Sequence, residues 1–95
     1  MSEQIKIIDE LYEVITGRKE KPVEGSYTNY LFSKGSNKIC KKVGEEAVEV
    51  IISATGGQKE DIIAEIADLT YHVLVLMAEK GITPEDVSEE LKKRQ

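Results

Sequence analysis

Residues 36–79 decide the fold; they read SNKICKKVGEEAVEVIISATGGQKEDIIAEIADLTYHVLVLMAE. Apolar side chains recur every three or four positions on both sides of Gly56 and Gly57, which is the spacing of helices that each bury one face. The predicted apolar stripe before the glycines contains Cys40, Val43, Ala47, Val50, Ile51 and Ala54. The stripe after them contains Ile62, Ile66, Leu69, Val73 and Leu76, widened by Ile63, Leu74 and Met77. We therefore predict an antiparallel pair of helices, about 37–54 and 58–79, joined by a tight turn.

Three shorter helices are predicted around this pair, over 2–16, over 28–34 and from 84 onward. The expected boundary residues are Ser2 and Gly17 for the first helix, Gly35 for the end of the second, and Thr83 with Pro84 for the start of the third. Residues 18–26 contain Pro22 and Gly25 and are predicted to form a polar loop. Because no alternating strand pattern occurs, we predict an all-α bundle of about five helices, in a single domain spanning 1–95.

Composition excludes several classes of function. The chain carries 13 basic and 18 acidic residues, a net charge of −5, which argues against nucleic acid and anionic membranes as partners. The longest apolar run, 73–78, is too short to span a bilayer, and no signal pattern follows Met1. One cysteine cannot form an internal disulfide, so a cytoplasmic location is expected. A chain of 95 residues without Trp has a small aliphatic core, and we expect it to pair with a second copy.

Acidic residues on the two long helices form the most informative pattern. Glu46 and Glu49 share one face of the first helix, and Glu65 and Asp68 share one face of the second. Two unit charges about 4 Å apart repel by about 1 kcal/mol in water and about 4 kcal/mol near a protein surface. If the apolar stripes pack together, the four carboxylates converge, and a hard divalent cation such as Mg²⁺ would relieve their repulsion. The alternative is a solvated helix face, the usual role of an isolated E-x-x-E pair.

Basic residues precede and overlap the start of the acidic helix. They are Lys34, Lys38, Lys41 and Lys42. Lysines near the first turn of a helix suit phosphate oxygens, although no Walker A motif is present. The alternative is a solvated surface in which Lys41 and Lys42 pair with Glu45 and Glu46 at a spacing of four residues.

The single histidine and its neighbours allow two interpretations each. His72 follows Asp68 by one helical turn, so it is either a hydrogen-bonded structural group or a second-shell donor beside the metal face. Tyr71 and Val75 lie away from the main apolar stripe. Together with Leu74, they predict a helix that is covered on two sides, for which a partner subunit is one explanation.

Three blocks of the sequence resemble a known family. SYTNYLF at 26–32, KVGEEAVE at 42–49 and EIADLTYH at 65–72, with Gly35 and Lys38 between the first two, are similar to phosphoribosyl-ATP pyrophosphohydrolase. This enzyme of histidine biosynthesis belongs to the MazG-like all-α NTP pyrophosphatases. The resemblance extends from about residue 5 to residue 91. It implies a MazG-like helical bundle completed by dimerisation, without the cyclohydrolase domain that is fused to some relatives.

The resemblance also implies a reaction and a set of site residues. The reaction is hydrolysis of the α–β phosphoanhydride of 1-(5-phosphoribosyl)-ATP to 1-(5-phosphoribosyl)-AMP and pyrophosphate, the second step of L-histidine biosynthesis. The implied Mg²⁺ ligands are Glu46, Glu49, Glu65 and Asp68, and the implied catalytic carboxylates are Glu45, Glu46 and Glu49, of which Glu45 or Glu49 would activate water. The implied phosphate-binding residues are Lys38, Lys41 and Lys42, with Lys34 and Arg18 as weaker candidates. The implied partner is a second copy in a homodimer.

Two other functions fit parts of the same pattern. A housekeeping pyrophosphatase for (d)NTPs would use the same acidic motif, and only the blocks at 26–32 and 65–72 favour phosphoribosyl-ATP. A non-catalytic helical dimerisation module would carry the carboxylates as a solvated face, with the lysines as their partners.

Overall fold

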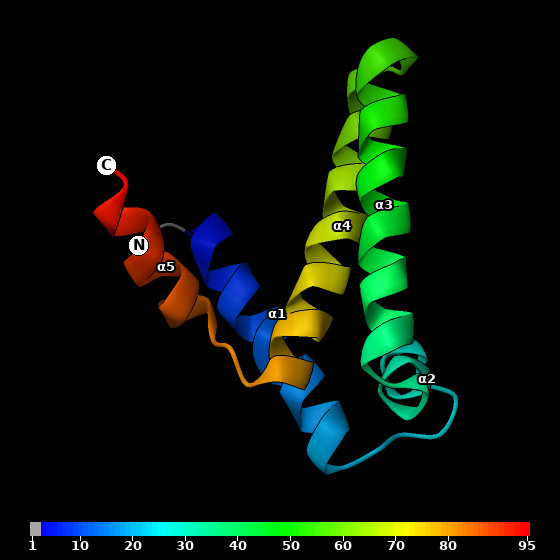
Figure 1. Ribbon diagram of the computed structural model, residues 1–95, viewed down its shortest axis with the longest axis vertical. Helices are drawn as coiled ribbons and strands as arrows, with labels where there is room; N and C mark the ends of the chain where they lie inside the picture. The colour runs from blue at the N-terminus through cyan, green and yellow to red at the C-terminus, as the bar shows by residue number, and fades with distance from the viewer. Residues whose placement is uncertain (1–2) are drawn as a thin grey trace.

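The computed structural model describes residues 3–95, which form five helices and their connections without a β-strand (Figure 1). The helices are α1 (Glu3–Glu20), α2 (Tyr27–Lys34), α3 (Ser36–Gly56), α4 (Lys59–Lys80) and α5 (Pro84–Lys93). The all-α prediction and the predicted number of helices are confirmed. Ser2, the expected first N-cap, lies outside the described residues. Among residues 3–95, each helix is either too short or too polar to span a lipid bilayer.

α3 and α4 form the predicted antiparallel hairpin and stand out from the other three helices (Figure 1). Gly57 makes the turn by donating its backbone N–H to the carbonyl of Ser53 at 2.7 Å. A Cβ at Gly57 would lie 2.8 Å from that carbonyl oxygen, so the turn requires glycine at this position. Gln58 then begins α4 with a capping box, in which its side chain and that of Asp61 each accept a backbone N–H of the other residue.

Local capping chemistry sets the bounds of α2 and α5. The Ser26 hydroxyl accepts the backbone N–H of Asn29 and starts α2, which ends at Gly35 with a φ of 89°. Thr83 and Asp86 form the capping box of α5, with Pro84 at its first helical position. Gly35 and Thr83 were expected at these boundaries, and they agree with the prediction because capping depends only on neighbouring residues. The Ser26 cap was not predicted, and α2 begins at Tyr27 rather than at residue 28.

α1 is longer than predicted: it passes through Gly17 and ends at Glu20. A glycine inside a helix costs about 1 kcal/mol relative to alanine. Tertiary contacts of the last turn offset this cost, since the Lys19 ammonium donates to the carbonyl of Ala78 and lies 5.5 Å from the ring centroid of Phe32. The helix stops before Pro22, which disfavours helical geometry in the preceding residue. The loop therefore covers 21–26 rather than 18–26.

The core lies where α1, α2, the beginning of α3 and the end of α4 meet. Its buried residues are Ile15, Leu31, Ile39, Leu74, Val75, Met77 and Ala78. Cys40, expected on the buried stripe, is exposed, and its neighbour Ile39 is fully buried instead. The buried face of α3 is shifted by one residue here because α2 packs against its first turns.

The second half of α4 is covered on two sides within this one chain. Leu74 and Val75 are both buried. α1, α2 and α3 all contact α4, so a partner subunit is not needed to explain these two residues. Five of the exposed apolar residues lie toward the far end of the hairpin: Val48, Ile51, Ile52, Ile63 and Ile66. Ile51, Ile63 and Ile66 were expected on the buried stripes and are not buried in the single chain.

Candidate active site

Three carboxylates from the two long helices converge on one face of the hairpin. Glu46 of α3 and Glu65 and Asp68 of α4 each place one oxygen so that the three atoms lie within 4.8 Å of one another. We call these three residues the acidic cluster. Helical spacing puts Glu65 and Asp68 on one face, and the packing of α3 against α4 brings Glu46 to them. Glu49, the fourth expected ligand, is exposed and is not part of this group, although its charge reaches Glu65.

The electrostatics of the cluster suit a hard divalent cation. Partial burial, followed by the negative charges of Asp68, Glu49 and Glu46, raises the pKa of the Glu65 carboxyl. Oxygen ligands from carboxylates are those that Mg²⁺ prefers in proteins. The donor set therefore fits Mg²⁺, with Glu46, Glu65 and Asp68 as the residues that would hold it and Glu49 at its edge.

We expect Glu65→Gln to raise the melting temperature of the metal-free protein at neutral pH. The raised pKa means that the folded state holds the Glu65 proton more tightly than the unfolded chain does. Stability is therefore greatest below the unfolded pKa and falls as pH rises through the folded pKa. Glutamine cannot ionise, so the variant avoids this loss of stability. The difference in melting temperature between the variant and the wild type should therefore shrink toward pH 4, where wild-type Glu65 is itself protonated. Melting curves in EDTA between about pH 4 and pH 8 measure it.

Glu13→Gln on α1 is the matched control, because this side chain is exposed and lies on a different helix. It should change the melting temperature little at any pH. A fall in melting temperature for Glu65→Gln at neutral pH would contradict the repulsion inferred for the cluster.

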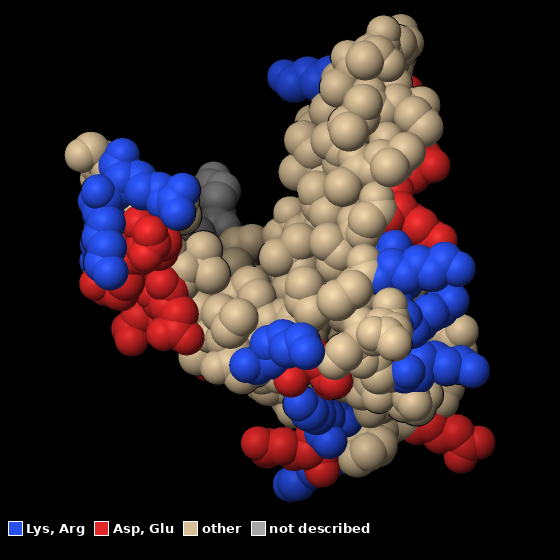
Figure 2. Space-filling model, viewed as in Figure 1, with Lys and Arg blue, Asp and Glu red and all other residues tan. Residues whose placement is uncertain are grey.

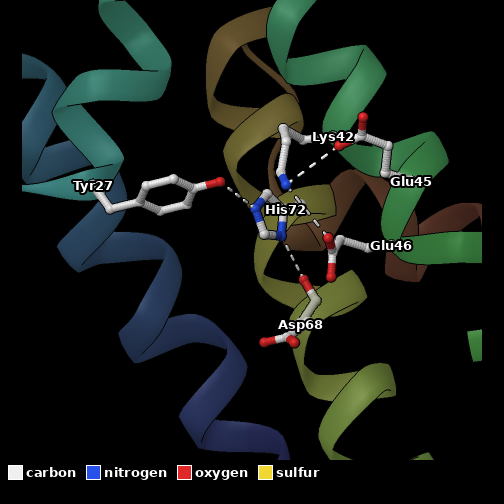
Figure 3. A network of polar contacts seen from close by, with 6 residues as sticks. All are labelled: Tyr27, Lys42, Glu45, Glu46, Asp68 and His72. Carbon is white, nitrogen blue, oxygen red and sulfur yellow. Dashed lines mark hydrogen bonds and ion pairs between the residues drawn. The ribbon is translucent and has the colours of Figure 1, made fainter. Parts of the chain in front are cut away.

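Lys42 adjoins the acidic cluster from α3 (Figure 3). Its ammonium lies 3.3 Å from Glu45 Oε1 and 3.5 Å from Glu46 Oε2. Desolvation alone would lower the pKa of Lys42, but the hydrogen bond to Glu45 and the charges of Glu45 and Glu46 outweigh it and raise that pKa. Lys42 therefore stays positively charged beside the carboxylates. The spacing-based pair Lys42–Glu46 is present, and the partner of Glu45 is Lys42 rather than Lys41.

The other basic candidates are distributed around the base of the hairpin. Lys38 is half-buried one turn before Lys42, and Lys41 is exposed. Figure 2 shows basic side chains gathered along one flank there, next to acidic ones. Lys34 lies over the ring of Tyr30, 5.7 Å from its centroid. Arg18 belongs to the last turn of α1 rather than to a loop.

His72 is buried, with 6% of its surface exposed, and both ring nitrogens have partners (Figure 3). Its Nδ1 lies 2.7 Å from the backbone carbonyl oxygen of Asp68, and its Nε2 lies 2.9 Å from the Tyr27 hydroxyl. A carbonyl only accepts, so Nδ1 donates its hydrogen to Asp68, and in the neutral ring Nε2 accepts from Tyr27. His72 thus contacts the main chain of Asp68.

The residues of α2 that reach this site were not predicted from the sequence. Beside the Tyr27–His72 pair, the hydroxyl of Thr28 is hydrogen-bonded to that of Tyr71. The polar groups of residues 71–72, directly before the apolar run 73–78, were the available signal, because buried polar groups require hydrogen-bond partners. The position of α2 over α4, which supplies those partners, depends on long-range packing.

Comparisons with known proteins agree on one family. The family described as phosphoribosyl-ATP pyrophosphohydrolase matches residues 8–95. A phosphoribosyl-ATP pyrophosphatase of Clostridium botulinum is 58% identical over 88 residues, which cover 93% of this chain and 80% of the relative. One from Clostridium novyi is 55% identical over 92 residues, covering 97% of this chain and 84% of the relative. The histidine biosynthesis bifunctional protein HisIE of Thermoanaerobacter pseudethanolicus is 60% identical over 89 residues, 94% of this chain but 41% of that longer protein.

Proposed function

Because the chain belongs to the phosphoribosyl-ATP pyrophosphohydrolase family, an enzyme family of histidine biosynthesis, we propose that it hydrolyses the α–β phosphoanhydride of 1-(5-phosphoribosyl)-ATP. The products are 1-(5-phosphoribosyl)-AMP and pyrophosphate, at the second step of L-histidine biosynthesis. The reaction depends on Mg²⁺. The observation that carries this proposal is the convergence of Glu46, Glu65 and Asp68 from two helices, with their oxygens within 4.8 Å of one another.

The acidic cluster holds the metal and the lysines hold the phosphates. When bound, Mg²⁺ neutralises charge on the triphosphate oxygens and on the leaving pyrophosphate. Glu46, Glu65 and Asp68 supply its protein oxygens, with Glu49 close to them. The ammonium groups that bind phosphate oxygens are those of Lys38, Lys41 and Lys42, and the weaker candidates are the Lys34 ammonium and the Arg18 guanidinium.

The attacking water needs a carboxylate to orient it and accept its proton. Glu45 already pairs with Lys42 at 3.3 Å, whereas Glu49 is exposed at the edge of the cluster and its charge acts on Glu65. We therefore assign this role to Glu49. The water oxygen forms a new bond to phosphorus, its proton passes to the carboxylate, and the bridging P–O bond breaks with its electron pair leaving on pyrophosphate.

The exposed apolar residues at the far end of the hairpin support a homodimer. Val48, Ile51, Ile52, Ile63 and Ile66 are each about half exposed or more. Figure 2 shows that this part of the hairpin surface is largely uncharged. Contiguous exposed apolar surface of this kind marks an interaction site, and a second copy of this chain would bury it.

A pyrophosphate-release assay tests the proposed reaction. We expect turnover of phosphoribosyl-ATP in Mg²⁺, loss of turnover in EDTA, and recovery when Mg²⁺ is restored. Plain ATP and the four dNTPs serve as competing substrates. Preference for a dNTP would instead support a housekeeping pyrophosphatase, and absence of pyrophosphate release from every substrate would support a non-catalytic dimerisation module.

A further inference from the structure

We propose that Tyr27 is a positioning residue for the acidic cluster: its hydroxyl holds His72, and His72 holds the turn of α4 that carries Asp68. This inference rests on the proposed function, because it concerns the residues assigned to the metal. Figure 3 shows Tyr27 entering from α2 and meeting His72 above Asp68.

The hydrogen bonds form a chain in which each donor points from Tyr27 to His72 and from His72 to Asp68. Tyr27 donates to His72 Nε2 at 2.9 Å, and His72 Nδ1 donates to the carbonyl of Asp68 at 2.7 Å. His72 is buried, so removal of either partner leaves a ring nitrogen unsatisfied. The Asp68 carbonyl fixes the tautomer that carries its hydrogen on Nδ1, and the Tyr27 hydroxyl, bonded to Nε2, holds the imidazole in the orientation that joins residues 68 and 72.

The Tyr27 hydroxyl lies where three helices meet. It bonds α4 through His72, and its electrostatic neighbours on α3 are Lys42 and Glu46. Desolvation raises the pKa of this hydroxyl and outweighs the positive charge of Lys42, which lowers it; Tyr71 and Glu46 add smaller increases, so the group remains a donor at neutral pH. Hydrogen-bonding partners behind metal-binding residues hold them in place, and their loss typically weakens metal binding about 10- to 100-fold.

A second hydrogen bond between α2 and α4 allows two roles of Tyr27 to be distinguished: positioning of His72 and attachment of α2 to α4. Thr28 and Tyr71 are hydrogen-bonded beside the Tyr27–His72 pair, but that bond does not lead to Asp68. The rings of Tyr27 and Tyr71 also stack, with centroids 6.2 Å apart. Phenylalanine at position 27 keeps this ring packing and removes only the hydroxyl.

The experiment measures Mn²⁺ binding to the substrate-free protein by electron paramagnetic resonance, which detects the free ion and does not depend on turnover. We expect Tyr27→Phe to raise the Mn²⁺ dissociation constant about tenfold. kcat at saturating metal should stay close to the wild-type value. Tyr30→Phe is the matched control, since Tyr30 lies on the same helix and is exposed, and it should bind Mn²⁺ as the wild type does. Circular dichroism verifies that each variant is folded.

His72→Asn and the double variant Tyr27→Phe/His72→Asn complete a double-mutant cycle. If Tyr27 acts through His72, the double variant should bind Mn²⁺ no more weakly than the weaker single variant. Multiplication of the two effects would overturn the inference. So would an unchanged dissociation constant for Tyr27→Phe, or a loss in Thr28→Val equal to that in Tyr27→Phe. Absence of Mn²⁺ binding by the wild type would overturn the proposed metal site as well, which distinguishes the two failures.

Discussion

Asp68→Asn and Glu46→Gln should each lower pyrophosphate release by roughly 100-fold or more while the helices stay folded. Each change removes one negative charge from the acidic cluster and keeps the size of the side chain. A loss of several kcal/mol of charge stabilisation corresponds to two or more factors of ten in rate. The same changes relieve repulsion among carboxylates, so the melting temperature of the metal-free protein should hold or rise. Turnover assays and melting curves in EDTA measure the two effects separately.

The two variants should differ in melting temperature, because only one of the two carboxylates forms an ion pair with Lys42. Glu46 also pairs with Lys42 at 3.5 Å, and Glu46→Gln loses that ion pair. The gain in melting temperature should therefore be larger for Asp68→Asn. Asp9→Asn on α1 is the matched control, because this side chain is exposed on another helix. A sharp fall in melting temperature in both cluster variants would reassign Glu46 and Asp68 to structural roles.

Ile51→Glu should dissociate the proposed homodimer. Ile51 is 62% exposed in the single chain, so a monomer can accommodate the glutamate, whereas a dimer that buries this position cannot. Loss of one buried Ile side chain removes about 1.5–3 kcal/mol, and burial of the new charge adds to that cost. The dimer dissociation constant should rise by two or more orders of magnitude, since each factor of ten corresponds to about 1.4 kcal/mol. Sedimentation equilibrium at several protein concentrations measures the shift.

Val23→Glu is the control for the dimer experiment. Val23 is an exposed apolar residue in the loop before α2, away from the far end of the hairpin. It should leave the association unchanged. If Ile51→Glu remained dimeric with the wild-type dissociation constant, the far end of the hairpin would not be the interface.

Helix boundaries that depend on neighbouring residues were predictable. Gly35 and Thr83 act within one turn of the chain, and each lies at the helix boundary where it was expected. Gly17 was misjudged because its intrinsic preference was opposed by contacts between Lys19 and α4, 59 residues away along the chain. The burial of Ile39 in place of Cys40 also results from tertiary contacts. Periodicity predicts that a helix has one apolar face, but the helix packed against it determines which residues of that face are buried.

The candidate site likewise has features that residue spacing predicts and features that only helix packing produces. The spacing of Glu65 and Asp68 placed both on one face of α4, and the spacing of Lys42 and Glu46 correctly indicated an ion pair. Spacing could not separate Glu49 from the other three carboxylates, because the relative rotation of two packed helices decides which oxygens approach within 4.8 Å. It also could not assign partners to His72.

The five helices and the residues that share each helical face follow from local sequence, because capping and the 3.6-residue period are properties of neighbouring residues. The packing of the helices sets which faces turn inward, brings Glu46 to Glu65 and Asp68, and brings Tyr27 to His72. Those contacts join residues 19 to 45 positions apart, and the packing of whole helices, rather than any local preference, brings them together.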